Sequence, residues 1–540
     1  MSQVQVAPFH QLKRQANLDA IHQVDEWDMV VIGGGITGAG VVREAARQGM
    51  RVLLLEQKDF SWGTSSRSSK MVHGGLRYLA SGNLKLTSHS VKERERLLQE
   101  APGLIDILPF SWLHYKGEFP GPFIFNSLLA LYDLMAGKRY RHFLSKSEAQ
   151  YQLLNIDTDN LLGATCFADA VTDDSRLVLR VLKEAEQDGA VLLNYAAATD
   201  VIKTDGHIGS LKLKLENERD EIIIKAKVIV SATGAWADKF RQDLGEKAKI
   251  RPLRGSHLVL PSWRLPMAQS ITMKHPVDGR SMFVYPWEGM TVIGTTDLDN
   301  PVVTCVEPVI QEHEVEYLIE AANSLFPSSS ISSEDIISSW AGVRPIVSNG
   351  GLNPSAEKRD HSIWDDQGLI TVSGGKLTTF RLIALDVLKA ASKYLPRLSW
   401  KDNKQQIFRQ ASSVPKEIKG LDFEVQKRLL GFYGTQIQSL CDCVGQEAWA
   451  LVPGTKTYWV QVRYAARYEQ AIHLDDILLR RTRVGLFCKG GGSGYKNIIK
   501  QICMTEMQWS EDQWNQEWDR YINIWNTSYS LPASAVKRPQ

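Results

Sequence analysis

The stretch DMVVIGGGITGAGVVREAARQGMRVLLLE, residues 28–56, decides the fold of this chain. It reads as a strand, a glycine turn, a helix and a second strand that ends in a carboxylate. Gly33 permits the tight turn, Gly35 lets a pyrophosphate approach the backbone, and Gly38 allows the helix to pack closely against the sheet. Glu56 can accept hydrogen bonds from a ribose diol, and its charge argues against the 2′-phosphate of NADP. The stretch therefore predicts a dinucleotide-binding βαβ unit whose helix N-terminus faces the pyrophosphate.

The segment that follows, FSWGTSSRSSKMVHGGLRYLASGN at 60–83, is unusually polar for its position. An NAD-binding domain would usually return to helix and strand here. Instead, several hydroxyl groups and a cation follow one another, and they can wrap the phosphates and ribityl chain of a longer cofactor. These side chains are Thr64, Ser65, Ser66, Ser68, Ser69 and Lys70. A solvated serine-rich loop is the alternative interpretation.

Two distant segments favour the longer cofactor. KVIVSATGAWA, residues 227–237, reads as a buried strand that ends in a turn at Gly234. GLITVSGGKLTTFRLIALD, residues 368–386, reads as another strand, a turn at Gly374 and Gly375, and a helix. That turn would direct a second helix N-terminus at the cofactor. A cofactor contacted near both ends of such a long span suits FAD better than NAD.

Seven motifs together carry a family resemblance. In chain order, between Ile32 and Leu486, they are IGGGITGAG, TSSRSSKMVHGGLRYL, LRGSHLVL, GTTD, AGVRP, SGGKLTT and RYAARYEQAIHLDDILLRRTRVGL. With these motifs the chain resembles the FAD-dependent, quinone-linked glycerol-3-phosphate dehydrogenases. The resemblance implies FAD as cofactor and oxidation of sn-glycerol 3-phosphate to dihydroxyacetone phosphate by hydride transfer to FAD, with the electrons passed to a membrane quinone.

The same resemblance implies an α/β fold. A Rossmann-like FAD-binding domain is expected beside an antiparallel-sheet substrate domain and a C-terminal helical domain. The residues expected to bind the cofactor are Gly33, Gly35, Gly38, Glu56, Thr64, Ser65, Ser66, Ser69, Gly234, Gly374, Gly375 and Thr378.

The cofactor segments are scattered, so the FAD-binding domain is expected to be discontinuous. We predict an N-terminal arm over 1–27 and a helical cap domain over 404–540, where apolar residues recur with helical periodicity. The FAD-binding domain would comprise 28–105, 165–250 and 340–395, and the substrate domain 106–164 and 251–339. The β-rich runs after residue 251 support the sheet of the substrate domain.

Length and charge limit the class of protein. The chain has 540 residues, which suggests two or three domains, and a net charge of +2, which gives no global case for nucleic-acid binding. The arm lacks the apolar region of a secretory signal, and no apolar run reaches the roughly 18 residues of a spanning helix. We expect a cytoplasmic protein that contacts the inner face of the cell membrane only peripherally.

The six cysteines are scattered through the chain. The close pair Cys441 and Cys443 has no second pair or histidines at ligand spacing, so no metal site is expected. Reduced thiols in a reducing compartment fit this pattern. There is also no D-x-[DN]-x-[DN]-G calcium loop, which mitochondrial relatives of this family tend to carry, so a bacterial type of enzyme is expected.

Two arginines are candidates for the substrate phosphate. A selective site for this near-dianion should present guanidinium groups, which bind its oxygens in bidentate fashion. By resemblance these are Arg77, in HGGLRYL, and Arg344, in AGVRP. The neighbours of Arg344 are apolar, so its charge needs an anionic partner. A salt bridge to a buried Asp or Glu is the alternative for both.

Three cationic or titratable side chains are candidates for the proton transfer. His73, His257 and Lys376 stand near glycines in motifs that the family places around the flavin, and His257 and Lys376 are also expected to contact substrate. Histidine has a suitable unperturbed pKa. A lysine at a helix start is disfavoured unless an anion is nearby, which suggests a role for Lys376 at the site. His257 ranks first as the base by a narrow margin, Arg344 is also counted among the catalytic residues, and the identity of the base stays open.

For three acidic residues we expect structural or supporting roles and no catalytic chemistry. Asp297, in GTTD, is expected only to support the site. In the acid pair Asp173 and Asp174, which precedes SRLVLRVL, Asp174 and Ser175 read as a helix cap.

Two basic regions are candidates for contact with an anionic membrane. In residues 122–146 an apolar helix precedes Lys138, Arg139, Arg141 and Lys146, and residues 456–500 carry nine Lys and Arg against three Asp and Glu. Core packing and a solvated charged face are the alternatives. A homodimer is left open. The rival functions are an oxygen-dependent oxidase of the same fold, acting on glycerol 3-phosphate or an amino acid, and a non-catalytic FAD-binding membrane adaptor.

Overall fold

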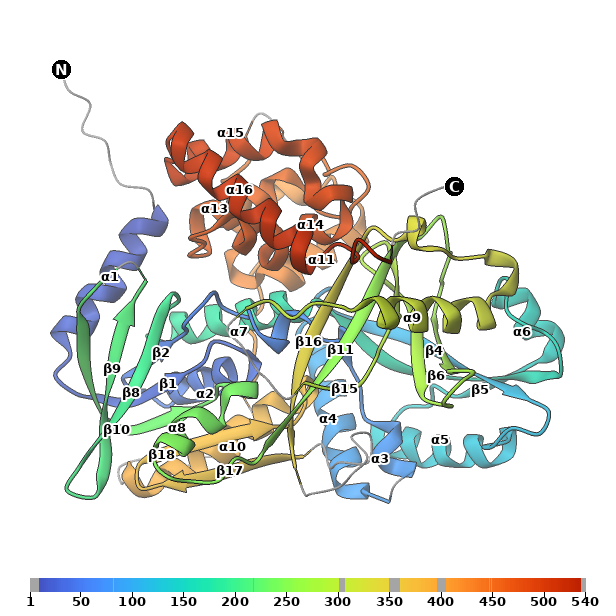
Figure 1. Cartoon of the computed structure of the whole chain (residues 1–540), viewed down its shortest axis with the longest axis horizontal. Helices are drawn as coiled ribbons and strands as arrows, with labels where there is room; N and C mark the ends of the chain where they lie inside the picture. The colour runs from blue at the N-terminus through green and yellow to red at the C-terminus, as the bar shows by residue number, and fades with distance from the viewer. Residues whose placement is uncertain are drawn as a thin grey trace.

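The computed structural model describes most of the chain. The described residues are 9–80, 82–216, 218–300, 306–348, 360–395, 405–445, 447 and 449–535. They form two large sheets side by side, with a group of helices above them (Figure 1).

The first sheet has eight strands and carries the dinucleotide motif. Its order is β17-β18-β10-β1-β2-β7, and β8 and β9 extend from β10. The strands are β1 (Trp27–Ile32), β2 (Val52–Leu55), β7 (Val191–Leu193), β8 (Ala196–Thr204), β9 (His207–Leu215), β10 (Glu221–Ser231), β17 (His361–Asp366) and β18 (Leu369–Gly374). Strands β18, β10, β1, β2 and β7 run parallel. The parallel sheet of the expected Rossmann-like domain is therefore present.

Alternating side chains of β1 face two different layers. Met29 and Val31 pack with helices α2 (Ile36–Arg47), α7 (Asp174–Gln187) and α10 (Phe380–Ala391). Val30 and Ile32 face the opposite side, where β8, β9 and Ile21 of α1 (Phe9–Gln23) cover the sheet. A parallel sheet covered on both faces explains the unbroken apolar runs of β1 and β2. The N-terminal arm is thus partly a helix that packs on this sheet.

The second sheet has ten strands. Its order is β15-β11-β14-β13-β12-β4-β6-β3, with β16 beside β11 and β5 beside β6. The strands are β3 (Met71–Val72), β4 (Ile105–Tyr115), β5 (His142–Ser145), β6 (Leu161–Thr172), β11 (Ile250–Pro261), β12 (Ser270–Lys274), β13 (Ser281–Trp287), β14 (Met290–Gly294), β15 (Leu298–Asp299) and β16 (Ser338–Val347). Apart from the parallel pair β4 and β12, all neighbours in this sheet are antiparallel.

This sheet takes more of the chain than the sequence suggested. Strand β6 crosses the expected domain boundary between 164 and 165, and β16 crosses the one between 339 and 340. Strand β3 lies inside the first expected FAD-binding segment. The division into domains stays a prediction, but these three strands pair with the substrate-side sheet.

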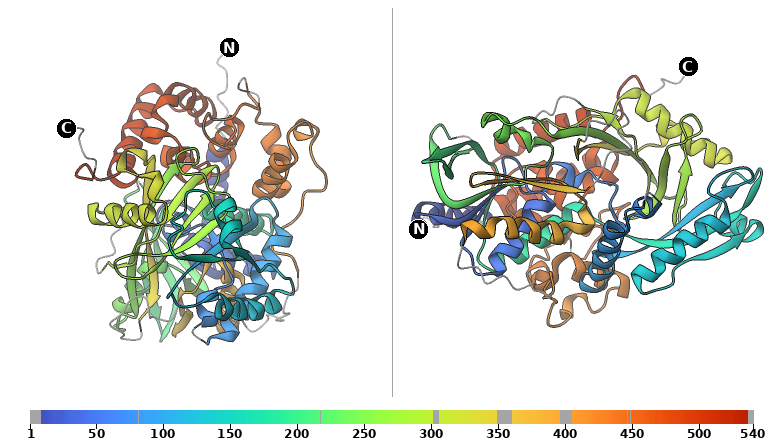
Figure 2. Two further views of the ribbon diagram at one scale, coloured as in Figure 1. Left: turned by 90° about the vertical axis from the view of Figure 1, so that its right-hand side faces the viewer. Right: turned by 90° about the horizontal axis from the view of Figure 1, so that it is seen from below.

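Five helices of the described part of the chain pack around the second sheet. They are α3 (Leu76–Ala80), α4 (Leu84–Glu100), α5 (Pro122–Ala136), α6 (Lys146–Gln152) and α9 (Glu312–Leu325), and the short α8 (Asp238–Asp243) lies by the first sheet. Helix α5 lies at the end of the molecule opposite α1 (Figures 1 and 2). Among the described residues no helix is long and apolar enough to cross a membrane.

The described residues after 404 are helical, as expected. The helices are α11 (Phe423–Tyr433), α12 (Ile437–Cys441), α13 (Trp459–Tyr468), a π-helix (Asp476–Arg481), α14 (Val484–Phe487), α15 (Lys496–Met507) and α16 (Glu511–Ser528). Trp514 and Trp525 of α16 share a hydrophobic core with Trp287 of β13 and Trp340 of β16. The helical domain is therefore packed onto the ten-stranded sheet rather than tethered by a linker alone.

Candidate active site

The glycine turn after β1 has the geometry that a dinucleotide requires. Gly33 has a φ of 110°, and a Cβ there would lie 2.6 Å from the carbonyl oxygen of Ala232. A Cβ on Gly38 would lie 1.9 Å from the carbonyl oxygen of Gly33, so only glycine allows α2 to approach the turn. The Gly35 N-cap has no capping side chain, and the next N–H, of Ile36, donates to Ser65 Oγ at 2.9 Å. These residues fit the pyrophosphate of the expected cofactor.

The Glu56 carboxylate is held beside this turn. It accepts hydrogen bonds from the N–H groups of Gly34 at 2.7 Å and of Lys58 at 2.8 Å. Burial raises the pKa of Glu56, while these two donors favour the charged form. Its position at the end of β2 matches the expected contact with a ribose.

The predicted cofactor segments converge at one edge of the first sheet. Strands β1, β10 and β18 are neighbours, so the turns that follow them meet at their carboxyl ends. Gly234 accepts a hydrogen bond from Ser373 Oγ at 3.0 Å. Gly374 and Gly375 have φ values of 82° and 83°, a conformation that side chains rarely adopt. The sequence placed these turns correctly.

The hydroxyl-rich segment is only partly as expected. Thr64 Oγ1 donates to the Val343 carbonyl at 2.5 Å, and Ser69 Oγ lies 2.9 Å from His257 Nε2. Ser66 is buried, and its hydroxyl faces the Trp62 carbonyl at 3.4 Å. Thr378 Oγ1 donates to the His73 carbonyl at 3.1 Å and so ties this segment to the helix start after β18.

Lys70 does not point toward the cofactor side, contrary to the interpretation of the segment. Its ammonium is fully buried, forms an ion pair with Asp174 at 2.9 Å and lies 4.6 Å from the Trp340 ring centroid. Burial, opposed by Asp174, lowers the pKa of Lys70 to about 8. An ammonium already paired with a buried carboxylate is not available to a phosphate. Asp173, one position before the expected cap, accepts the Arg176 N–H at 2.9 Å and caps α7.

A cavity of about 1000 Å³ lies between the two sheets. Its walls include Ser69, His73, Arg344, Gly375 and Lys376. A cluster of aromatic side chains forms an apolar part of the lining: Phe110, Trp112, Phe125, Phe167 and Phe283. The volume suits a large ring system together with a small substrate.

Arg344 lines this cavity and also has a protein partner. Its Nη1 lies 2.9 Å from Asp297 Oδ1, and its Nη2 donates to Thr295 Oγ1 at 3.0 Å. The side chain of Arg344 is 22% exposed, and that of Asp297 is 6% exposed. The salt bridge that the sequence left as an alternative is therefore present, but it leaves Arg344 in the cavity wall. Asp297 has the supporting role expected of it.

The three candidate bases occupy different positions. His73 and Lys376 line the cavity, and Lys376 Nζ lies 3.5 Å from the Tyr78 ring centroid and 3.1 Å from Ser90 Oγ. Lys376 stands at the N-cap of a short 3-10 helix, as expected. His257 is 1% exposed and is absent from the cavity lining; its ring stacks on Trp340 at 4.8 Å.

Burial lowers the pKa of His257 well below its usual value, and the charges of Arg344 and Lys70 act in the same direction. The ring is therefore neutral at pH 7, and it reaches the cavity only through Ser69. The other arginine candidate, Arg77, belongs to α3, but its side chain lies outside the described part of the chain.

Asp169 was missed by the sequence analysis. This buried carboxylate lines the cavity and accepts the N–H of Gly74 at 3.0 Å, next to His73. Arg94 Nη1, at 2.6 Å, and Tyr132 OH, at 2.7 Å, hold the same oxygen. A single acid in the run FADAV gives no local signal for this role. Among the described residues no group of three or more His, Cys, Asp or Glu side chains is placed to hold a metal ion.

Comparisons with known proteins bear on the whole chain. Residues 28–384 match the family model of FAD dependent oxidoreductases, and residues 387–514 match that of the C-terminal domain of alpha-glycerophosphate oxidase. The chain is 33% identical to an aerobic glycerol-3-phosphate dehydrogenase of Staphylococcus haemolyticus, over 93% of this chain and 94% of the relative. It is 32% identical to one of Staphylococcus aureus, over 91% and 92%.

Solved structures agree in fold. A glycerol-3-phosphate dehydrogenase from Bacillus halodurans complexed with FAD superimposes with a TM-score of 0.78 at 26% identity, covering 95% of this chain and 97% of that one. The L-alpha-glycerophosphate oxidase of Mycoplasma pneumoniae with FAD bound gives 0.54 at 18% identity, covering 70% and 97%, a likeness of fold alone.

Proposed function

Because this chain belongs to the FAD-dependent oxidoreductases, in the family of the aerobic glycerol-3-phosphate dehydrogenases, we propose that it oxidises sn-glycerol 3-phosphate to dihydroxyacetone phosphate. The proposed final electron acceptor is a membrane quinone. Its cofactor is FAD, as in the family.

One observation carries the choice of substrate. The guanidinium of Arg344 and the ammonium of Lys376 line the same cavity. These two cations, in a cavity whose lining also includes Arg280 and the carboxylates of Asp278 and Asp297, favour a small substrate with a dianionic group. An amino-acid substrate would need only one cation for its carboxylate. We assign Arg344 to the substrate phosphate.

The reaction removes a hydride from the secondary carbon of the substrate and a proton from its hydroxyl. FAD, when bound, supplies the hydride acceptor. The chain must hold the phosphate, orient the carbon and receive the proton. His73 lines the cavity and can receive the proton directly, whereas Lys376, also in the lining, could receive it only as the neutral amine and not as the ammonium. His257 is neutral and can take it only through Ser69 Oγ, so it would act by orienting that hydroxyl.

Anaerobic mixing with glycerol 3-phosphate tests the function. We expect the flavin absorbance to bleach rapidly, and we expect the reduced protein to reoxidise slowly in air and rapidly with a soluble quinone. Rapid reoxidation in air would instead identify an oxidase. That second candidate is favoured by the match of residues 387–514 to the oxidase C-terminal domain. No bleaching would leave the amino-acid oxidase and the non-catalytic adaptor.

We also propose that the protein docks on an anionic membrane at the inner face of the cell membrane. Apolar side chains project from the region of α5: Phe119, Phe123 and Leu134 are 73%, 85% and 77% exposed. Exposed Lys138 and Arg139 follow the helix. An apolar surface bordered by cations suits an anionic bilayer.

The second basic region is less exposed than its sequence suggested. Its arginines 463, 480, 481 and 483 are buried. Each pairs with at least one carboxylate of the chain. Four of the nine cations in residues 456–500 are therefore neutralised inside the molecule, so the basic surface of this region is smaller than its sequence suggested.

A further inference from the structure

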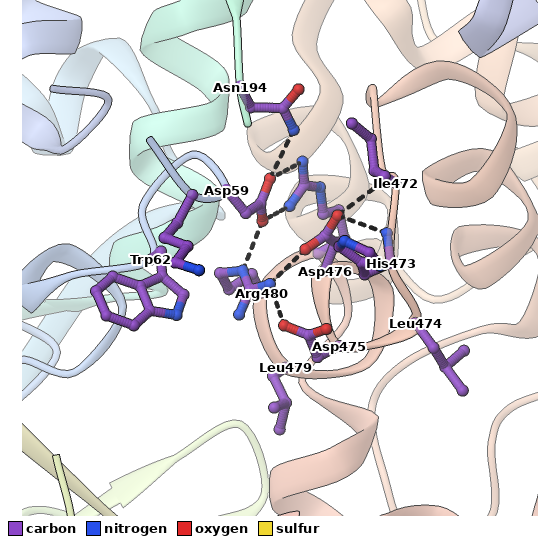
Figure 3. A network of polar contacts seen from close by, with 12 residues as sticks. Asp59, Trp62, Asn194, Ile472, His473, Leu474, Asp475, Asp476, Leu479 and Arg480 are labelled. Atoms are coloured by element: carbon purple, nitrogen blue, oxygen red, sulfur yellow. Dashed lines mark hydrogen bonds and ion pairs between the residues drawn. The ribbon is translucent and has the colours of Figure 1, made fainter. Parts of the chain in front are cut away.

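Three buried arginines of the helical domain point toward the segment that wraps the cofactor. Arg480, Arg481 and Arg483 are 1%, 3% and 2% exposed. They lie on the π-helix and just after it, and none of them lines the cavity. Their partners lie in the FAD-binding part of the chain, between residues 59 and 66. Figure 3 shows the part of this network around Asp59.

Asp59 is the centre of the contact. Its fully buried carboxylate accepts hydrogen bonds from Arg480 Nε at 2.5 Å and Arg481 Nη2 at 2.8 Å, and from Asn194 Nδ2 at 3.1 Å. Arg480 also pairs within the helical domain, where its Nη2 lies 2.6 Å from Asp475 Oδ2. Two guanidinium groups of the helical domain thus hold the Asp59 carboxylate. The Asn194 amide, at the end of β7, holds it from the other direction.

A second contact lies further along the same segment. Arg483 Nη1 donates to the Ser66 carbonyl at 3.1 Å, and its Nη2 lies 3.0 Å from Asp173 Oδ1. Arg67 Nη2 in turn donates to Tyr529 OH at 3.0 Å, from the chain after α16. The C-terminal part of the chain therefore contacts this segment at three residues, Asp59, Ser66 and Arg67.

The contacted segment carries groups that are expected to face the nucleotide. Asp59 follows Glu56 by three residues, and the Lys58 N–H between them donates to the Glu56 carboxylate. The Ser61 N–H donates to the Gly34 carbonyl at 2.9 Å, inside the glycine turn. A shift of Asp59 would therefore move the carboxylate expected at the ribose and the turn expected at the pyrophosphate.

We propose that Arg480, Arg481 and Arg483 are positioning residues for the cofactor, through which the C-terminal helical domain holds residues 56–66 in the conformation that binds the adenosine half of FAD. A buried ion-pair network adds little net stability compared with apolar packing, but it fixes one arrangement of the segments that it joins. Preorganisation of that kind reduces the cost of ordering a loop on binding. The proposal depends on FAD as cofactor and not on the identity of the substrate.

The test compares release of FAD from the purified holoprotein after dilution, followed by the rise in flavin fluorescence without substrate. We expect Arg481→Met and Asp59→Asn to release FAD at least about 10-fold faster than the parent, which corresponds to about 1.4 kcal/mol. Arg481→Lys keeps the charge but not the planar guanidinium fork, so its rate of FAD release should lie between those of the parent and Arg481→Met.

The matched control is Arg463→Met. Arg463 of α13 is also buried, and it pairs with Glu447 at 2.6 Å and with Glu506, both in the helical domain. This variant loses a buried ion pair of the same domain, so its Tm should fall, while FAD release should stay within about twofold of the parent.

Two results would overturn the proposal: parent-like release from Arg481→Met, or equal acceleration in Arg463→Met. If Arg481→Met does not fold, Asn194→Ala removes the amide hydrogen bond to the Asp59 carboxylate, together with the contacts of that amide to Arg14 and Gln470, and should still accelerate release. Parent-like release from that variant would then count against the proposal. Substrate turnover does not enter this measurement, so a wrong substrate would leave its outcome unchanged.

Discussion

At the scale of single residues, Glu56 tests the nucleotide site directly. Glu56→Ala should weaken retention of FAD, because each charge-assisted hydrogen bond to the ribose is worth about 1.5–3 kcal/mol. The variant also leaves the Gly34 and Lys58 N–H groups without this acceptor. Equilibrium dialysis of the purified protein measures the loss. Glu56→Gln should lose less, and a protein that carries NAD would contradict the assignment.

Arg344 tests the substrate phosphate. Arg344→Ala should lose roughly 2–5 kcal/mol of transition-state binding, about 30-fold to several thousand-fold in kcat/KM. Arg344→Lys should recover little, because an ammonium cannot reproduce the planar fork that contacts Asp297 and Thr295 together. Steady-state kinetics with an artificial dye as acceptor gives the ratio.

Glycerol, which lacks the phosphate, is the control substrate for Arg344. Its poor turnover should hardly change in Arg344→Ala if the residue acts only on the phosphate. An equal loss for both substrates, at normal FAD content, would place Arg344 at the reacting carbon or the flavin instead. Asp297→Asn removes the ion pair but leaves the guanidinium in place, so it separates the effect of the pair on turnover from the effect of the cation.

At the scale of one element, α5 has two distinct faces. Phe125, Leu129 and Tyr132 are buried, whereas Phe123 and Leu134 project outward. The helix ends at Gly137, whose φ of 68° forms a left-handed cap. The outer face offers apolar area that no described part of the chain covers. This arrangement is the basis of the docking surface proposed above.

The double variant Phe123→Asp, Leu134→Asp should bind anionic vesicles at least about 10-fold more weakly, since burial of each large apolar side chain is worth about 1.5–3 kcal/mol. Dye-linked turnover should remain. Sedimentation with vesicles measures the effect, and Phe423→Asp, at a 74% exposed phenylalanine of the helical domain, is the control. Unchanged sedimentation of the double variant would remove α5 from the docking surface.

Replacement of Lys138, Arg139 and Arg141 with Ser should have a smaller effect than three independent cations would give. Each juxtamembrane cation contributes about 1 kcal/mol on anionic lipid. Two of these charges already face carboxylates, since Lys138 lies 3.0 Å from Glu95 and Arg141 lies 2.7 Å from Asp133. The binding loss should shrink as salt concentration rises. A loss that does not depend on salt would show that the cations do not act electrostatically.

At the scale of the whole molecule, His473 joins the helical domain to the first sheet. Its ring lies 3.2 Å from Glu216, just after β9, and 2.8 Å from Glu517 of α16. Burial opposes the charge, but hydrogen bonds to these two carboxylates outweigh it and raise the pKa of His473 to about 10. The imidazolium is therefore the ordinary state of the folded protein.

This pair of contacts should make stability depend on pH. The folded-state pKa exceeds the unfolded value of about 6.5, so the stabilisation is complete below pH 6.5 and is lost as the pH rises toward 10. We expect His473→Gln to cost about 2 kcal/mol at pH 6 and close to nothing above pH 10. Thermal unfolding at both pH values measures this, with the exposed His22→Gln as control. A constant difference between parent and variant across the range would contradict it.

The sequence was sufficient wherever a function depends on local backbone geometry. The spacing of Gly33, Gly35 and Gly38 and the turn at Gly374 predicted the backbone turns that the structure shows, because a tight turn or a close approach leaves few residues to choose from. The contacts of these residues and of Glu56 with the cofactor stay predictions. The motifs also indicated the family, FAD as cofactor and the order of the domains. The family models and the relatives confirm the family and the cofactor.

Only the tertiary structure decided where the charged side chains point. Lys70 and the arginines after residue 479 looked like groups for phosphate or lipid, yet Lys70 pairs with Asp174, and Arg480 pairs with Asp59 across 421 residues of sequence. It also decided that Arg344 contacts Asp297 and that β6 and β16 belong to the second sheet. A charge is neutralised by whichever segment the fold brings against it, and no local pattern encodes that partner.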